Sequence, residues 1–436
     1  MQLVLLISTL LSFLLSFVTA VPTCGLVPPS NSQTTISNKS GNNSTSEDVV
    51  ASAWLPGWLT NFDLNTIPWQ SYSHLTFSFA VTTNDQSMVS LDKVNTAFLQ
   101  SFVSRAHQEN VGALVSIGGW TGSQYYSTLM QPSNQAAFVN TIVSMVKQYN
   151  LDGIDFDWEY PGKQGIGCNQ ISPDDSSNFL SFLQKLRQDP VGSKLKLTAA
   201  VSITPFAGPD GTPMSDVSKF GEVLDFLNIM NYDIWGSWSS TVGPNAPLFD
   251  SCAPTAEGSG QSAVKAWTGA GFPANKIVLG VAAYGHSFSV AQSVAVVNGA
   301  LGMYPTFNKA MQPPGQGETA STTTTDQCGN SSGPTGIWTF EGLVSGGFLQ
   351  NNNGTIAPAT GVMYTYDNCS QTPFIYDPNK QIMVSFDDAT SFAAKGKFIN
   401  DNGLAGFAMW DATGDTPQNT LINAISDAIG IEQYCN

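Results

Sequence analysis

The stretch LDGIDFDWEY, residues 151–160, alternates acidic with apolar side chains and decides the fold. On an extended strand, residues two apart lie on the same face, separated by ~6.6 Å. Asp155, Asp157 and Glu159 therefore point to one side of the predicted strand, and the apolar residues between them point to the other. In a parallel barrel the apolar face would pack against helices. The acidic face would line the interior near the strand's carboxyl end, where barrel active sites lie.

Strand-like runs of this kind recur along the chain from residue 49. They alternate with helical patterns, such as those within residues 94–106, 138–146 and 179–186. The eight runs are Val49–Gly57, His74–Ala80, Gly112–Ile117, Gly153–Trp158, Leu195–Ile203, Phe226–Tyr232, Ile277–Tyr284 and Leu404–Trp410. Strand–helix repetition requires a parallel sheet with crossovers, and eight repeats predict an α/β fold, closed as a (β/α)8 TIM barrel.

The gap between the seventh and eighth runs is longer than a crossover needs. From about residue 287 to about residue 395 it contains Ser/Thr/Gly-rich tracts and strand-like pieces at Gly361–Tyr366 and Gln381–Phe386. We predict a small α+β insertion between strands 7 and 8, on one rim of the barrel. The catalytic barrel with its insertion would then cover residues 49–436.

Clustered carboxylates on an inner barrel face indicate a functional site. They repel one another, which raises the pKa of at least one of them. A solvent-facing amphipathic strand is the structural alternative, but the inner face of a barrel strand is not solvated. A transition-metal site is the other functional interpretation. The chain has only His74, His107 and His286, none near this stretch, so we expect no metal and no cofactor.

The charge balance excludes some partners. The chain has 16 Lys and Arg against 32 Asp and Glu residues, a formal net charge of −16. That charge would repel nucleic acid and anionic membranes, whereas a neutral polysaccharide would not be repelled. We therefore expect no nucleic acid and no membrane among the partners.

The amino-terminal segment is typical of an exported protein. Residues 1–20 hold an apolar run that ends in Val18-Thr19-Ala20, which predicts a cleaved signal peptide. Residues 21–48 are polar and predict a flexible, glycosylated arm at the amino terminus. Six Asn-x-Ser/Thr sequons occur, at Asn38, Asn42, Asn43, Asn330, Asn353 and Asn368. We expect a secreted, extracellular monomer.

Several motifs resemble those of glycoside hydrolase family 18 chitinases. DGIDFDWE at residues 152–159 resembles the family signature DGxDxDWE, which is highly specific. SIGGW at residues 116–120 resembles the family's SxGGW, and MNYD at residues 230–233 resembles its MxYD. Tyr284-Gly285 and Trp410 match further positions. The resemblance covers roughly residues 49–436 and implies that chitin or chitooligosaccharides are the partners.

The resemblance also implies residue roles. Family 18 enzymes use the N-acetyl oxygen of the sugar as the nucleophile, in a retaining, substrate-assisted reaction. Glu159 would protonate the leaving oxygen and later activate water. Asp157 would orient the acetamido N–H, Asp155 would share a proton with Asp157, and Tyr232 would donate to the acetamido oxygen. Residues implied in substrate binding are Gly118, Gly119, Trp120, Thr121, Tyr160, Met230, Asn231, Tyr232, Asp233 and Trp410.

Three positions depart from the family pattern, and two other functions stay open. His286 stands where the family usually has Arg, Trp54 where it often has Tyr, and Asp411 where Glu is commoner. We expect an endo-acting or mixed-mode chitinase that cleaves β-1,4-N-acetylglucosamine linkages. The alternatives are an endo-β-N-acetylglucosaminidase acting on N-glycans and a non-catalytic chitin-binding lectin.

Six cysteines follow the predicted signal peptide, and fifteen pairings are open to them. We expect Cys328–Cys369 within the insertion, because both residues lie in that segment. Cys168 and Cys252 follow strands four and six on one rim and could pair. Cys24 and Cys435 would then join the two termini.

Overall fold

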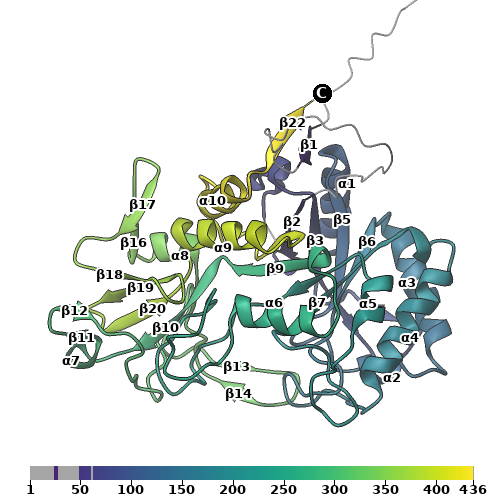
Figure 1. The fold of residues 1–436 in the computed structure, drawn as a ribbon, viewed down its shortest axis with the longest axis horizontal. Helices are drawn as coiled ribbons and strands as arrows, with labels where there is room; N and C mark the ends of the chain where they lie inside the picture. Colours follow the sequence, from purple (N-terminus) through teal and green to yellow (C-terminus); the bar gives the residue numbers. More distant parts are fainter. Residues whose placement is uncertain (1–23, 28–48, 60–61, 436) are drawn as a thin grey trace, which may run out of the picture.

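A closed parallel barrel forms the body of the molecule (Figure 1). The computed structural model describes residues 24–27, 49–59 and 62–435. The barrel strands are β2 (Val50–Pro56), β3 (His74–Thr82), β5 (Gly112–Gly118), β6 (Gly153–Asp157), β7 (Lys196–Val201), β8 (Phe226–Ile229), β9 (Ile277–Ala282) and β21 (Gly406–Trp410). They are hydrogen-bonded in that order, and β2 pairs with both β3 and β21, which closes the ring. The predicted (β/α)8 fold is therefore confirmed.

Helices cover the outside of the barrel. They are α1 (Thr96–Gln108), α2 (Tyr126–Leu129), α3 (Gln135–Tyr149), α4 (Asp175–Gln188), α5 (Ser218–Val223), α6 (Gly260–Gly269), α9 (Ala389–Asp401) and α10 (Thr420–Ile429). Local sequence explains several of their starts: the Asn95 side chain caps α1, and capping boxes begin α6 at Ser259 and α9 at Asp388.

The two faces of β6 separate as the sequence predicts. Phe156 packs between α4 residues Phe179 and Phe182, with ring centroids 5.7 Å apart in each case. Asp155 lies on the opposite face and is fully buried inside the barrel. Apolar packing against α4 therefore fixes the direction in which the carboxylates of β6 point.

The insertion between β9 and β21 is built on a second sheet. Its five strands are antiparallel, in the order β15 (Ile337–Thr339), β10 (Tyr284–Ser289), β20 (Ile382–Ser385), β19 (Thr372–Asp377) and β18 (Met363–Asp367). Short helices α7 (Gln292–Ala295) and α8 (Phe340–Ser345) add the helical part. Short hairpins are β11 (Val296–Val297) with β12 (Ala300–Leu301), β13 (Thr324–Thr325) with β14 (Ser331–Ser332), and β16 (Leu349–Asn352) with β17 (Thr355–Pro358). The two-residue strand β4 (Val89–Ser90) pairs with β3 at the barrel rim.

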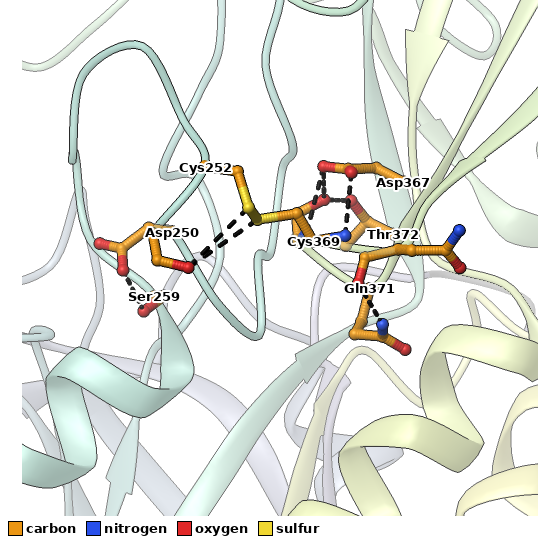
Figure 2. Close-up of a disulfide and its surroundings, with 10 residues drawn as sticks. Asp250, Cys252, Ser259, Asp367, Cys369, Gln371 and Thr372 are labelled. Carbon is orange, nitrogen blue, oxygen red and sulfur yellow. Dashed lines mark hydrogen bonds between the residues drawn. A yellow bond between two sulfur atoms is a disulfide. The ribbon is translucent and has the colours of Figure 1, made fainter.

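Two of the predicted disulfides are wrong. Cys168 pairs with Cys328 and Cys252 pairs with Cys369, with Cα atoms 5.6 and 6.1 Å apart. Figure 2 shows the second bond, which joins the β8–α6 connection to the turn after β18. The expectation assumed that the insertion closes on itself, but its cysteine-bearing loops face the barrel rim, so both bonds join insertion to barrel.

The described ends of the chain lie together. Strands β1 (Cys24–Val27) and β22 (Glu432–Cys435) pair antiparallel, with Cys24 opposite Cys435 in register. A disulfide between them stays a prediction. Figure 1 shows this pair at the end of the molecule farthest from the β13–β14 hairpin.

The predicted signal peptide at 1–20, most of the predicted arm at 21–48 and the sequons within it lie outside the described residues. Asn330, Asn353 and Asn368 are described and exposed. Within the described ranges, none of the helices has the length and apolar character needed to span a bilayer.

Candidate active site

Asp155 lies at the centre of the site, enclosed by hydrogen-bond donors. Oδ2 accepts from Trp54 Nε1 (3.2 Å) and Ser116 Oγ (2.8 Å). Oδ1 accepts from Thr198 Oγ1 (2.5 Å) and Asn228 Nδ2 (3.4 Å). Burial raises the pKa of Asp155, although these four donors oppose the shift. The donors come from four other barrel strands, so they fix this carboxyl group in place.

Asp157, two residues along the same face, has few partners. Its side chain is almost completely buried, and Oδ1 has no hydrogen-bond partner among the described residues. Burial raises its pKa well above the usual range, and the nearby carboxylates of Glu159 and Asp155 raise it further. Both causes favour the neutral, protonated form of Asp157, which can donate a hydrogen bond.

Glu159 follows the end of β6 and is 8% exposed. Burial raises its pKa to about 8; the charge of Asp233 adds to the shift, and a hydrogen bond from Tyr160 opposes it. Its main chain is held on both sides, because the N–H donates to Ser123 Oγ (3.0 Å) and the carbonyl accepts from Asn169 Nδ2 (2.8 Å). The raised pKa favours the protonated form of Glu159 at neutral pH, and its main chain is held in place; both features suit a general acid.

Two glycines let β5 approach β6 closely. Gly118 has a φ of +105°, and a Cβ atom there would lie 2.1 Å from the carbonyl oxygen of Asp157. The N–H of Gly119 donates to the same oxygen (2.8 Å), which also accepts from Ser123 Oγ (3.0 Å). The structure therefore gives Gly118 and Gly119, both buried, a role in positioning the end of β6.

Aromatic side chains line the rim around the carboxylates. Trp410 at the end of β21 is half-buried, and Phe79 stacks on it with ring centroids 5.5 Å apart. Trp58 lies 6.3 Å from Phe79 and is 50% exposed. Trp120 is equally exposed, and its neighbour Thr121 is exposed too. Exposed aromatic faces of this kind suit stacking against sugar rings.

The loop after β8 brings a phenol and a carboxylate to the same rim. Burial raises the pKa of Tyr232 well above its usual value, with the charge of Asp157 as the next cause, so its hydroxyl stays a donor. Asp233 Oδ1 accepts from Tyr284 OH and pairs with His286 Nε2, both at 2.7 Å. Partial burial would raise the pKa of Asp233, but the His286 contacts outweigh it and lower the pKa.

The remaining implied binding residues lie deeper. Asn231 is fully buried and donates to the carbonyl of Pro247 (3.0 Å), so it anchors the loop instead of reaching the surface of the site. Met230 is half-buried and packs with the apolar cluster that contains Trp54. Tyr160 hydrogen-bonds Glu159, and burial raises its pKa.

Sequence reasoning missed the residues that support the carboxylates. They are Trp54, Ser116, Ser123, Asn169, Thr198 and Asn228. A signal existed for some of them, since Asn228 is the single polar residue of β8, and Thr198 is the one polar residue of β7 beyond the exposed Lys196 that begins the strand. Among the residues that the structure describes, no cluster of three or more His, Cys, Asp or Glu side chains could hold a metal ion.

The comparisons with known proteins agree with this geometry. Residues 43–415 match the model of "Glycosyl hydrolases family 18". A "chitinase-like effector" of Moniliophthora roreri is 46% identical over 88% of this chain and 94% of its own length. The crystal structure of a Rhizomucor miehei chitinase is similar with a TM-score of 0.76 and 32% identity, covering 86% of this chain and 99% of that one. An Ostrinia furnacalis Group IV chitinase in complex with allosamidin gives a TM-score of 0.70 at 25% identity, over 88% and 99% of the two chains.

A family model that spans most of the chain, and a solved chitinase with the same barrel, agree with the carboxylate row on β6. The chain belongs to the glycosyl hydrolases of family 18.

Proposed function

We propose that this chain is a secreted chitinase that hydrolyses β-1,4-N-acetylglucosamine linkages with retention of configuration. The observation that carries the proposal is Glu159, a carboxyl group whose pKa burial raises to about 8 at the rim of the barrel. A lectin on the same barrel would need no such acid. Residues 1–20 support the secreted location, because they have the pattern of a signal peptide.

In the proposed reaction each group has a step. Glu159 gives its proton to the glycosidic oxygen while the N-acetyl oxygen of the bound sugar attacks the anomeric carbon. The ionised Glu159 then takes a proton from the water that opens the cyclic intermediate, which restores the acid. Asp157 and Tyr232 lie beside it with raised pKa values, so they can hydrogen-bond the acetamido group that does the attacking.

A non-catalytic chitin-binding protein is the second candidate. One observation favours it: the similar Moniliophthora roreri protein is called a chitinase-like effector. Exposed Trp58 and Trp120 would serve such a protein equally well, since stacking needs no acid. Enzymatic trimming of N-glycans is the third candidate and shares the acid with the first.

One assay separates the three candidates. The purified chain is incubated with chitotetraose and, separately, with a high-mannose glycopeptide. Cleavage of chitotetraose alone supports the chitinase, cleavage of the glycopeptide supports the N-glycan enzyme, and binding without cleavage supports the lectin. Proton NMR of the first products should show the β-anomer, and Glu159→Gln should lower kcat by about 10²-fold or more.

A further inference from the structure

A long loop of the insertion projects from the molecule; we call residues 319–335 the cleft arm. It contains the β13–β14 hairpin. Glu318 fixes its base, because the carboxylate accepts from the N–H groups of Gly315 (2.6 Å), Thr335 (3.0 Å) and Gly336 (3.3 Å). Ser287 of β10 donates to the carbonyl of Gly336 (2.8 Å), which ties this base to the insertion sheet.

The tip of the cleft arm is bonded to the loop that follows the catalytic strand. Cys328 lies at the turn of the hairpin and forms the disulfide with Cys168 in the β6–α4 connection. The next residue, Asn169, donates its side-chain N–H to the carbonyl of Glu159. The tip is therefore fastened to a loop that directly contacts the catalytic acid.

The cleft arm is exposed along its length. None of its residues is buried, and all residues of β13 and β14 are exposed. A Cβ atom added at Gly329 or Gly333 would meet no other atom within 4 Å. A segment packed flat on the surface would have buried residues on one face, and the cleft arm has none. Figure 1 shows the hairpin extending along one edge of the molecule, away from the insertion sheet.

The order of the strands around the barrel indicates which strand ends lie between the two ends of the cleft arm. It starts from the insertion after β9 and ends after β6, and β7 and β8 lie between these strands. From β9 to β6 there are three strand spacings, which amount to ~14 Å. Residues 319–328 can reach ~30 Å when extended, which is enough for an arch.

Side chains of the cleft lie at these strand ends. Asp233 follows β8 and bonds His286 on β10 (2.7 Å). The ring of Trp238 lies 5.4 Å from that of His286 and is 58% exposed. Asp233 and Trp238 therefore both contact His286 on the insertion sheet from which the cleft arm leaves, and the arm ends at the loop after β6.

We propose that the cleft arm is a bar across the Trp238 side of the cleft, which makes the site select chain ends and short chains over the interior of a long polymer. The proposal rests on the chitin hydrolysis proposed above. A sugar chain that extends past Trp238 must pass beneath the cleft arm, and the disulfide prevents the tip from lifting. A chain end can be threaded through the opening, whereas an interior segment with long extensions cannot enter sideways. The expected endo-acting or mixed mode would thus shift toward chain ends.

The test opens the bar in two ways. One variant carries Cys168→Ser and Cys328→Ser; the other replaces residues 320–334 by two glycines and carries Cys168→Ser. Both are assayed on chitotetraose and on soluble glycol chitin of high molecular weight, by new reducing ends and by viscosity. We expect the viscosity loss per reducing end to rise at least threefold in both variants, while kcat/KM for chitotetraose changes by less than twofold.

The other disulfide supplies the control. Cys252→Ser with Cys369→Ser also removes a bond between insertion and barrel, but it leaves the cleft arm closed, so the viscosity ratio should not change. An unchanged ratio in both opened variants overturns the proposal. An equal loss on both substrates also overturns it, because the Cys168–Cys328 bond would then only position the Glu159 loop.

Failure of the chitinase proposal is separable from failure of this one. If the unmodified protein cleaves neither substrate, the bar is tested by binding, followed by tryptophan fluorescence in the Glu159→Gln background. Opening the cleft arm should then tighten binding of glycol chitin at least threefold and leave chitotetraose binding unchanged. Equal changes for the two ligands would overturn the bar.

Discussion

Replacing Glu159 by Gln should abolish catalysis. It should also make the variant increasingly more stable than the wild-type protein as the pH rises, because the wild-type protein loses stability. Burial raises the pKa of this carboxyl from 4.5 to about 8. Between these two values the unfolded chain releases the proton and the folded protein keeps it. A raised folded-state pKa means that stability is fully present below the unfolded pKa and is lost as the pH rises through the folded pKa. The amide of Gln does not titrate and escapes this loss.

The size of the effect follows from the shift. For each pH unit between 4.5 and about 8, the free energy of unfolding of the wild-type protein falls by ~1.4 kcal/mol relative to that of the variant. This pH-dependent difference in the free energy of unfolding should reach ~3 kcal/mol at about pH 6.5 and ~5 kcal/mol above about pH 8. Any fixed difference in packing between carboxyl and amide is the same at every pH, so the slope carries the information.

The measurement is denaturant unfolding of both proteins across this pH range, with the free energy difference plotted against pH. Glu257→Gln is the control, because it makes the same change at an exposed side chain. A flat line for Glu159→Gln, or a gap that narrows as the pH rises, would refute the raised pKa and with it the assignment of Glu159 as the acid.

Three further substitutions test the support of the site and the fold, each by kinetics or by denaturant unfolding. Gly118→Ala should cost more than ~3 kcal/mol, because its Cβ would collide with a β6 carbonyl, whereas Gly167→Ala, also at positive φ but in open space, should cost only ~1–2 kcal/mol. Lys395→Met should cost ~3–5 kcal/mol, because it leaves the buried carboxylate of Asp387 unpaired. Lys397→Met should be nearly neutral, because the ion pair of Lys397 is exposed. Trp54→Phe removes a donor from the central carboxyl group and should lower kcat about tenfold with a smaller change in KM; equal kcat would show that this donor is dispensable.

The barrel could be predicted from sequence because its strands are buried on both faces, which produces long apolar runs. The carboxylate row was predictable for a related reason: period-two alternation within 153–159 places all three acids on the inner face. The hydrogen bonds to Asp155 were not predictable, since Trp54 and Thr198 reach it through the relative register of separate strands. That register depends on how the ring closes, which no local pattern encodes.

Two of the disulfides were predicted wrongly for the same kind of reason. Cys328 and Cys369 are both in the insertion, and closeness in sequence suggested a bond between them. Which cysteines meet depends on how the insertion docks on the rim, and each of these residues meets a barrel loop instead. The cleft arm escaped prediction as well, because its Ser/Thr/Gly-rich sequence resembles any surface loop.

The pairing of β1 with β22 has a practical consequence. This ribbon lies next to the short turn at Trp69–Ser71, which precedes β3 and so marks the amino end of the barrel. The carboxylates of β6 lie toward the opposite, carboxyl end of the barrel strands. A tag, surface linker or second domain fused at this ribbon would therefore attach the molecule at the end of the barrel opposite the carboxylates. Copies immobilised in this way would all present the opening to the solution, which suits capture of insoluble material on a sensor or a column.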